Sequence, residues 1–183
     1  MPRYWFSKPY ADFVQRLRAP SGFLLAAAFA YWSAPTAESL AWGSGVSVAG
    51  LLLRAWAAGH LAKNQRLATS GPYAFTRNPL YIGTLLVAAG LAIASRQPAL
   101  AALFAVAFAL VYLPAIELEE QHLRSLFPEY EGYARRVPRL GFRVSAPRGQ
   151  QSFRLALYRQ NEEYKAAIGW VAVVALLVWK IWR

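Results

Sequence analysis

Arg77, Asn78 and Pro79 stand where a polar segment meets an apolar one, and their types suit the binding of an anion. Gly71 and Pro72, shortly before them, are typical of a turn. Pro79 disfavours helical dihedral angles at the residue before it and suits the first position of a helix, so Asn78 is the expected N-cap. The amides of that helix end, beside the Arg77 guanidinium, would attract a carboxylate or a phosphate. The alternative is that Asn78 only caps the helix and Arg77 only reaches toward lipid headgroups.

A second polar segment contains three closely spaced carboxylates, Glu117, Glu119 and Glu120. Glu120 lies four residues before Arg124, which is the favourable order for a solvated ion pair on a helix. Glu119 instead falls on an apolar stripe at helical spacing. Because unpaired burial of a carboxylate is costly, Glu119 is expected to have a cationic partner, either a protein cation or a ligand. The stripe consists of Tyr112, Ala115, Ile116, Leu123 and Leu126.

Arg54 and His60 lie near the end of the second long apolar stretch. Ionisable side chains inside a membrane are usually functional, so Arg54 is one candidate partner for Glu119, and Arg77 is the other. Arg54 would otherwise extend its guanidinium to the membrane surface or pair with Glu117. His60 is more simply a structural residue at the interface than a base, because a single histidine without an identified partner does not by itself indicate catalysis.

Residues 127–139 combine aromatic and basic side chains with two prolines. The sequence predicts a short helix that begins near Pro128 and ends before Pro138. Tyr130 and Tyr133 share one face of this helix. The pattern is typical of an anchor at the level of the lipid headgroups.

The elements that must position these residues are apolar helices. Of the 183 residues, 57% are hydrophobic and only 16% are charged, which is unusual for a soluble chain of this length. Five stretches approach the length that crosses a hydrocarbon core of about 30 Å. They are apolar on every face, which argues against a soluble helical bundle. The predicted spans are residues 20–33, 40–59, 79–95, 98–116 and 166–182.

The distribution of positive charge predicts the orientation of the chain. The N-terminal tail, residues 60–78 and residues 117–165 hold 4, 3 and 9 of the 20 Lys and Arg residues. Positive residues are retained in the cytoplasm, so we expect an inner-membrane protein with its N-terminus inside and its C-terminus outside. This arrangement explains the net charge of +11 without nucleic acid as a partner. The absence of Cys and the presence of only two His predict no metal site.

Four short motifs occur in order around two of the predicted spans: Gly71-Pro72-Tyr73, Arg77-Asn78-Pro79-Leu80-Tyr81-Ile82-Gly83, Glu119-Glu120 and Tyr130-x-x-Tyr133-x-x-Arg136-Val137-Pro138. Over residues 50–140 they resemble the isoprenylcysteine carboxyl methyltransferase and phospholipid methyltransferase superfamily. Members commonly have Arg-His-Pro where this chain has Arg77-Asn78-Pro79. Asparagine keeps a hydrogen-bonding group but does not titrate, so the resemblance does not extend to an acid–base role for Asn78.

The resemblance implies an integral membrane enzyme that binds S-adenosyl-L-methionine at the cytoplasmic face and takes a lipophilic methyl acceptor from the membrane lipids. Glu119 would pair with the ammonium group of the cofactor and Arg77 with its carboxylate. Tyr73 or Tyr81 would face the sulfonium by cation–π attraction. The implied cofactor contacts are Gln65, Arg66, Leu67, Ala68, Tyr73, Asn78, Pro79, Leu80, Tyr81 and Glu119.

Methyl transfer is an in-line displacement, so alignment and the exclusion of water matter most. A carboxylate acceptor of the isoprenylcysteine type needs no general base. A lipid amine must first lose a proton, and then Glu120, His60 or His122 is a candidate base. The catalytic candidates are therefore Glu120, Arg77 and His60.

Two other functions stay open. Sterol reductases resemble this superfamily in their C-terminal half, so a membrane reductase that uses a reduced nicotinamide is one alternative. The other is a non-catalytic lipid-binding protein in which the polar segments only anchor the chain. Binding of one cofactor and not the other separates these hypotheses.

We expect an all-α, polytopic chain with about five transmembrane helices and a single membrane-embedded domain over residues 1–183. Its catalytic core covers about residues 50–140, and residues 141–183 add a juxtamembrane helix and the last span. Residues 152–165 are expected to form a basic amphipathic helix. Its polar residues either face solvent, the more common case, or line the entrance for the acceptor; they are Arg159, Asn161, Glu162 and Glu163.

Overall fold

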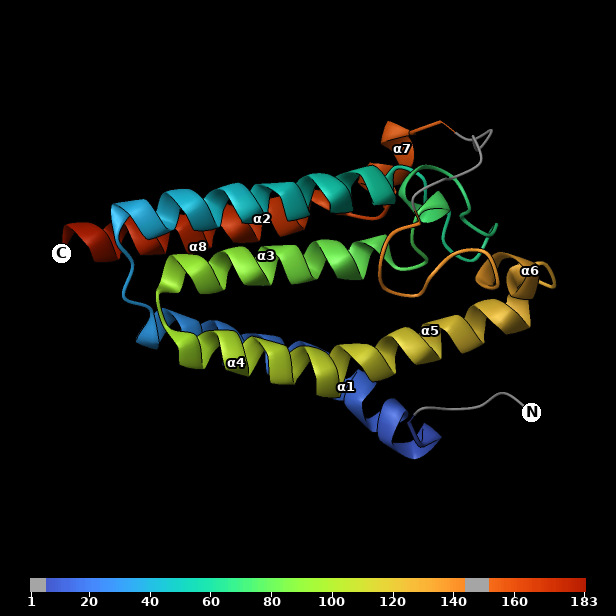
Figure 1. The fold of residues 1–183 in the computed structure, drawn as a ribbon, viewed down its shortest axis with the longest axis horizontal. Helices are drawn as coiled ribbons and strands as arrows, with labels where there is room; N and C mark the ends of the chain where they lie inside the picture. The colour runs from blue at the N-terminus through green and yellow to red at the C-terminus, as the bar shows by residue number, and fades with distance from the viewer. Residues whose placement is uncertain (1–5, 144–151) are drawn as a thin grey trace. The chain divides into compact units, whose positions relative to one another are not determined.

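The computed structural model describes residues 6–143 and 152–183, and the regular elements in these ranges are all helical (Figure 1). This confirms the all-α prediction. In chain order the elements are α1 (Lys8–Trp32), α2 (Ala37–Ala58), the 3-10 helix η1 (Gly71–Ala74), α3 (Pro79–Ser95), α4 (Pro98–Ala107), the π-helical segment η2 (Phe108–Tyr112), α5 (Leu113–Leu126), α6 (Tyr130–Ala134), α7 (Leu155–Gln160) and α8 (Tyr164–Trp182).

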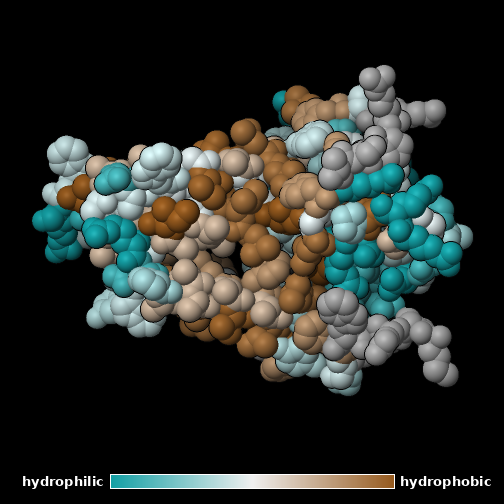
Figure 2. Space-filling model, viewed as in Figure 1, coloured by the Kyte–Doolittle hydropathy of each residue, from teal (hydrophilic) through white to brown (hydrophobic). Residues whose placement is uncertain are grey.

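Three helical runs among the described residues are long and apolar enough to cross a membrane. They are α2, the continuous run Pro98–Leu126 and α8, and α3 is a shorter apolar helix. Large apolar side chains such as Phe23, Leu24 and Trp42 are exposed, and Figure 2 shows hydrophobic residues over much of the visible face. Contact with lipid explains such a surface, because a soluble protein rarely exposes apolar patches of this extent. The chain is therefore an integral membrane protein, and the count of five spans stays a prediction.

The chain divides into two compact units, and α2, α3, α5 and α8 contribute to both. Unit 1 comprises Met1–Ser47, Ala88–Gln121 and Val173–Arg183, and unit 2 comprises Val48–Val87 and His122–Ala172. The four motifs are distributed accordingly. Those at residues 71–83 and 130–138 belong to unit 2, whereas the two consecutive glutamates belong to unit 1.

The core of unit 1 is apolar and is completed by contacts at the ends of its helices. Phe29, Ala94, Leu100 and Leu177 form a buried cluster. Lys180 donates from Nζ to the carbonyl oxygen of Ser33 at 2.6 Å and to its Oγ at 3.0 Å. The ammonium group thus satisfies carbonyl oxygen that the end of α1 leaves without a helical partner.

Unit 2 depends on the close approach of α2 and α3. A Cβ atom added to Gly50 would lie 2.6 Å from the carbonyl oxygen of Gly83, and one added to Gly83 would lie 2.5 Å from Cγ of Arg54. Such distances leave no space for a larger residue at either position. Small residues of this kind allow the backbones of membrane helices to approach each other closely. They bring the first turn of α3 next to the last turns of α2.

Candidate functional site

The candidate site in unit 2 centres on the loop before α3, which is bound to the chain segment after α6. The amide of Arg77 donates to the carbonyl oxygen of Pro138 at 2.9 Å, and the amide of Arg143 donates to that of Phe75 at 2.9 Å. These two bonds pair main-chain groups that lie outside any helix, so they satisfy polar groups that would otherwise be buried unpaired. The second and fourth sequence motifs therefore lie together.

Asn78 occupies the predicted N-cap position, and its side chain has a further role. α3 begins at Pro79, and the carbonyl oxygen of Asn78 accepts from the amides of Tyr81 and Ile82 at 3.1 Å each. The prediction of the helix start is confirmed. Nδ2 of the buried Asn78 donates to the carbonyl oxygen of Arg139 at 3.1 Å, which adds a side-chain link between the loop and the segment after α6.

Two tyrosines of α6 hold the loop from the other side. The hydroxyl of Tyr133 donates to the carbonyl oxygen of Tyr73 at 2.8 Å, and that of Tyr130 accepts from Arg77 NH1 at 3.5 Å. Both α6 rings are buried and pack in one apolar cluster with Leu67 and Val137. The prediction that the two tyrosines share a face is confirmed, but they face the protein interior, so the lipid-anchor interpretation of these two side chains is wrong. α6 spans only Tyr130–Ala134, shorter than predicted.

The stretch at residues 65–68 contributes one exposed side chain and three more enclosed ones. Gln65 is exposed, whereas Leu67 and Ala68 are buried. Nε of Arg66 is buried and has no hydrogen-bond partner among the described residues. A buried guanidinium donor without an acceptor is a fitting position for a carboxylate, because such a donor is costly to leave unsatisfied.

Tyr73 and Tyr81 are buried in the same unit, and Tyr73 packs with Ala57 and Ala68. The groups of unit 2 that could contact a ligand are therefore two guanidinium groups, two aromatic rings and the N-terminus of α3. This chemistry fits the carboxylate and the sulfonium of S-adenosylmethionine, which need a cation and an electron-rich ring. Among the described residues, no group of three or more His, Asp or Glu side chains is placed to hold a metal ion.

His60 lies in an enclosed position at the end of α2. Its Nδ1 lies 3.0 Å from the carbonyl oxygen of Trp56, and because a carbonyl only accepts, Nδ1 carries the proton. The rings of Trp56 and Phe153 lie at 6.3 and 6.2 Å from the imidazole. Gly71, with a φ of +57°, approaches so closely that a Cβ there would lie 2.7 Å from the ring. These contacts agree with the structural interpretation of His60.

The predicted facing of the carboxylates on α5 is wrong. Glu119 is exposed, whereas Glu120 is 1% and Glu117 2% exposed. Within the regular α5 the buried face runs through Ile116, Glu117 and Glu120, and the stripe residue Leu126 is 41% exposed. An apolar side chain is also stable toward lipid, so apolar spacing alone does not identify the face of a membrane helix that points to the protein interior. The pairing of Glu119 with the ammonium group of the cofactor stays a prediction.

The predicted partners of these acids are also different in the structure. Arg124 forms an ion pair with Glu131, with Nε 2.7 Å from Oε1, and not the solvated pair expected with Glu120. Glu117 accepts from the amide of Phe6 at 3.1 Å through Oε2. It is therefore not the partner of Arg54 that the sequence left open.

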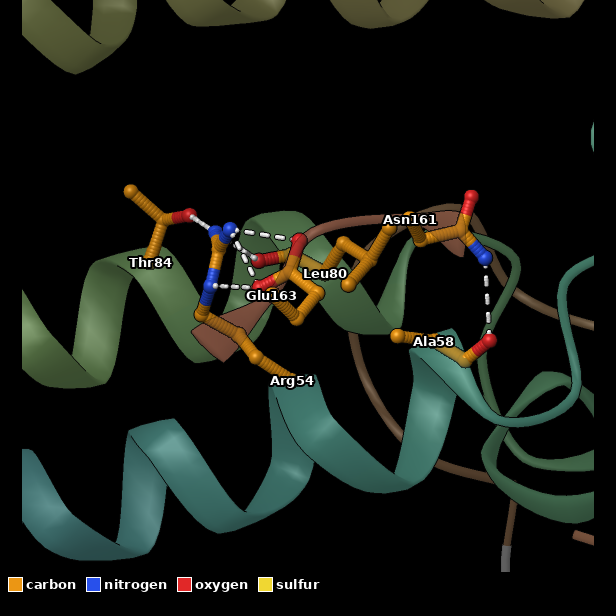
Figure 3. Close-up of polar contacts among 6 residues, drawn as sticks. All are labelled: Arg54, Ala58, Leu80, Thr84, Asn161 and Glu163. Carbon is orange, nitrogen blue, oxygen red and sulfur yellow. Dashed lines mark hydrogen bonds and ion pairs between the residues drawn. The ribbon is translucent and has the colours of Figure 1, made fainter. Parts of the chain in front are cut away.

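Arg54 instead pairs with Glu163, a partner that the sequence did not identify (Figure 3). Nε and NH2 of Arg54 donate to the two carboxylate oxygens of Glu163 at 2.9 and 2.8 Å. A weak signal existed, because the topology prediction places both residues at the cytoplasmic ends of their spans. Local spacing alone does not pair residues that are 109 positions apart.

The continuous helix predicted for residues 152–165 is wrong. α7 covers Leu155–Gln160, and α8 begins at Tyr164. Between them Glu162 has a φ of +56°, a left-handed conformation that interrupts the helix. Asn161 and Glu163 point toward α2, so they are not simply solvated.

These features define an integral membrane protein in which arginines and buried tyrosines gather around the loop before a membrane helix. Residues 41–130 match a family model described as phospholipid methyltransferase. This match confirms, for residues 41–130, the resemblance inferred from the motifs.

Two curated relatives have informative names. The chain is 42% identical over 111 residues to the Cobalt-zinc-cadmium resistance protein CzcN of Cupriavidus metallidurans, covering 60% of this chain and 51% of the relative. It is 40% identical over 103 residues to the Nickel-cobalt-cadmium resistance protein NccN of Alcaligenes xylosoxydans xylosoxydans, covering 55% and 48%. The chain thus spans about half the length of these relatives. No solved structure matches it.

Proposed function

We propose that the protein transfers a methyl group from S-adenosylmethionine to a lipophilic acceptor, either an isoprenylcysteine-type carboxylate or a lipid amine. The observation that carries this proposal is the family match, which covers the loop containing Arg77 and Asn78. The fixed main chain of this loop supports it, because a bound cofactor must be held in one orientation for in-line transfer. S-adenosylmethionine would supply the activated methyl group on its sulfonium.

The residues of the chain would bind and orient the cofactor. The guanidinium groups of Arg66 and Arg77 and the N-terminus of α3 would bind its carboxylate, and Tyr73 or Tyr81 would face the sulfonium. The other contacts proposed from the family resemblance are Gln65, Leu67, Ala68, Asn78, Pro79, Leu80 and Glu119.

The need for a base depends on the acceptor. A carboxylate acceptor attacks without losing a proton, whereas a lipid amine must be deprotonated first. Glu120 or His60 would then accept the proton. For His60 only Nε2 is suited to this, because Nδ1 donates to the carbonyl oxygen of Trp56.

Calorimetry on the purified full-length chain tests the cofactor. We expect S-adenosylmethionine and its demethylated product to bind and a reduced nicotinamide dinucleotide not to bind. Binding of the nicotinamide alone would favour a membrane reductase of the sterol reductase type, and binding of neither would favour a non-catalytic lipid-binding protein. Transfer of labelled methyl groups into a total lipid extract, and then into prenylcysteine analogues, identifies the acceptor.

We also propose that the protein lies in the inner membrane with its N-terminus inside and its C-terminus outside, as the charge distribution predicts. The absence of native Cys makes single-cysteine labelling a direct test. A cysteine at exposed Lys63 should resist an impermeant thiol reagent in intact cells, and one at exposed Arg96 should react. The reverse pattern would contradict the orientation.

A further inference from the structure

Arg54 bonds to three residues of unit 2, namely Glu163, Leu80 and Thr84. Its guanidinium forms the two-point ion pair with Glu163, donates from NH1 to the carbonyl oxygen of Leu80 at 3.3 Å, and donates to the hydroxyl of Thr84 (Figure 3). The side chains of Arg54 and Glu163 are only 21% and 11% exposed. One guanidinium therefore connects α2, α3 and the residue before α8.

The contact with α3 falls on its first turn. Leu80 follows Pro79 directly, and its carbonyl oxygen also accepts from the Thr84 hydroxyl at 3.0 Å. Arg54 thus contacts the main chain only three residues after Arg77. A shift of Arg54 would shift the helix N-terminus that is proposed to hold the cofactor carboxylate.

The other end of the ion pair is also fixed in place. Nδ2 of Asn161 donates to the carbonyl oxygens of Ala58 and Leu61 at 3.0 and 2.8 Å. Ala58 is the last residue of α2, and Leu61 follows shortly after it. The amide of Arg154 donates to the carbonyl oxygen of Gly59 at 2.9 Å. Residues 152–163, which we call the C-terminal segment, are thereby held on the end of α2 before Glu163 reaches Arg54.

A charged pair at this position has a cost that an apolar pair of similar size avoids. Both ions lose hydration, and only close geometry with additional hydrogen bonds offsets the loss. Ionisable groups within membrane segments are, for this reason, usually functional. Here the additional bonds go to Leu80 and Thr84, so they act on the start of α3.

We propose that Arg54 and Glu163 are positioning residues, which fix the first turn of α3 through the C-terminal segment so that the loop before it can hold the cofactor. This inference rests on the proposed function. It assigns a role in the site to residue 163, which lies outside the matched family region at residues 41–130.

The test compares Glu163→Gln with Glu162→Gln in the full-length chain. Glu162 is a matched control because it pairs with Lys165 on the surface, where the two side chains are 55% and 61% exposed. Hydrogen exchange of residues 79–86 without cofactor reports the positioning itself. Calorimetry with S-adenosylmethionine and the kcat of methyl transfer report its consequence.

We expect Glu163→Gln to accelerate exchange in residues 79–86 and to weaken cofactor binding by about tenfold or more, since small misplacements have large effects on bound geometry. Glu162→Gln should change neither. Thr84→Val removes only one acceptor of the guanidinium, so it should also accelerate exchange and weaken cofactor binding, but by less. This variant serves as the test if Glu163→Gln does not fold.

Unchanged exchange in residues 79–86 would overturn the positioning role. Faster exchange with unchanged cofactor affinity would also overturn it, because the pair would then be structural only. If the wild-type chain itself fails to bind S-adenosylmethionine, the proposed function fails, and the exchange data still decide whether the pair fixes α3.

Discussion

The contact between α2 and α3 occurs in both units, with different chemistry in each. In unit 1 small residues meet at this contact. A Cβ atom on Gly43 would lie 2.3 Å from the carbonyl oxygen of Gly90, and Oγ of Ser47 lies 2.3 Å from the position of a Cβ on Gly90. In unit 2 the glycine pair recurs, but the neighbouring inward position of α2 holds Arg54 and its ion pair.

This difference separates what the fold requires from what the site requires. In both units the small residues let α2 and α3 approach closely. In unit 2 the ion pair of Arg54 is added to this contact. Its position beside the first turn of α3 is better explained by the demands of the site, where the geometry must be held more closely than packing alone ensures.

The largest effect is expected from Gly50→Leu, which fills the contact in unit 2. A Cβ at Gly50 meets backbone atoms of α3 below 3.0 Å, so the helices must separate. We expect a loss of about 3 kcal/mol in the free energy of unfolding, at the upper end of typical overpacking costs, or no folded protein. Thermal unfolding in detergent measures it.

Gly45 provides the control on the same helix. A Cβ there would have no neighbour within 4 Å, so Gly45→Leu should leave stability unchanged or raise it slightly, since leucine favours a helix. Equal losses for the two variants would show that the small residues do not act through this contact.

The next largest effect distinguishes the two adjacent glutamates. Glu120→Ala removes a buried carboxylate and leaves its surroundings unsatisfied, so we expect a loss of about 2 kcal/mol in unfolding free energy. Glu119→Ala, at an exposed position, should leave stability nearly unchanged.

If Glu119 nevertheless binds the cofactor ammonium, Glu119→Gln should weaken S-adenosylmethionine binding without lowering the melting temperature. Equal small effects of Glu119→Gln and Glu120→Gln on S-adenosylmethionine binding would remove Glu119 from the site.

These glutamates show where sequence reasoning succeeds and where it stops. Local signals predicted the start of α3 at Pro79 and the common face of Tyr130 and Tyr133, because proline geometry and helical spacing act within a few residues. The prediction of which glutamate is buried failed, because an apolar side chain on a membrane helix is stable toward lipid as well as toward the protein, so the apolar stripe did not identify the buried face that holds Glu117 and Glu120.

The partner of Arg54 was missed for a different reason. The sequence left two roles open for Arg54: extension to the membrane surface, or pairing with Glu119 or Glu117. Which carboxylate takes that role depends on tertiary packing, through the break at Glu162 that directs the C-terminal segment back to α2. Periodicity carries no information about such long-range contacts.

A smaller effect is expected from Tyr133→Phe, which tests the link between α6 and the loop. The variant deletes the buried hydrogen bond to the carbonyl oxygen of Tyr73 and keeps the ring in its cluster. We expect a loss of about 1 kcal/mol. Tyr164→Phe is the control, because Tyr164 is 40% exposed and its hydroxyl can bond to water. A loss as large for Tyr164→Phe would contradict a specific role of the buried bond.

The smallest effect should come from the ion pair between Arg124 and Glu131. The two side chains are 29% and 59% exposed, so water and salt screen their attraction, unlike that of the enclosed pair at Arg54. Glu131→Gln should lower the unfolding free energy by at most about 0.5 kcal/mol, and the difference should vanish in about 1 M salt. Unfolding of both proteins at low and high salt measures this. A loss above that of Tyr133→Phe would show that exposure does not distinguish the charged pairs of this protein, and the contrast with Arg54 would lose its basis.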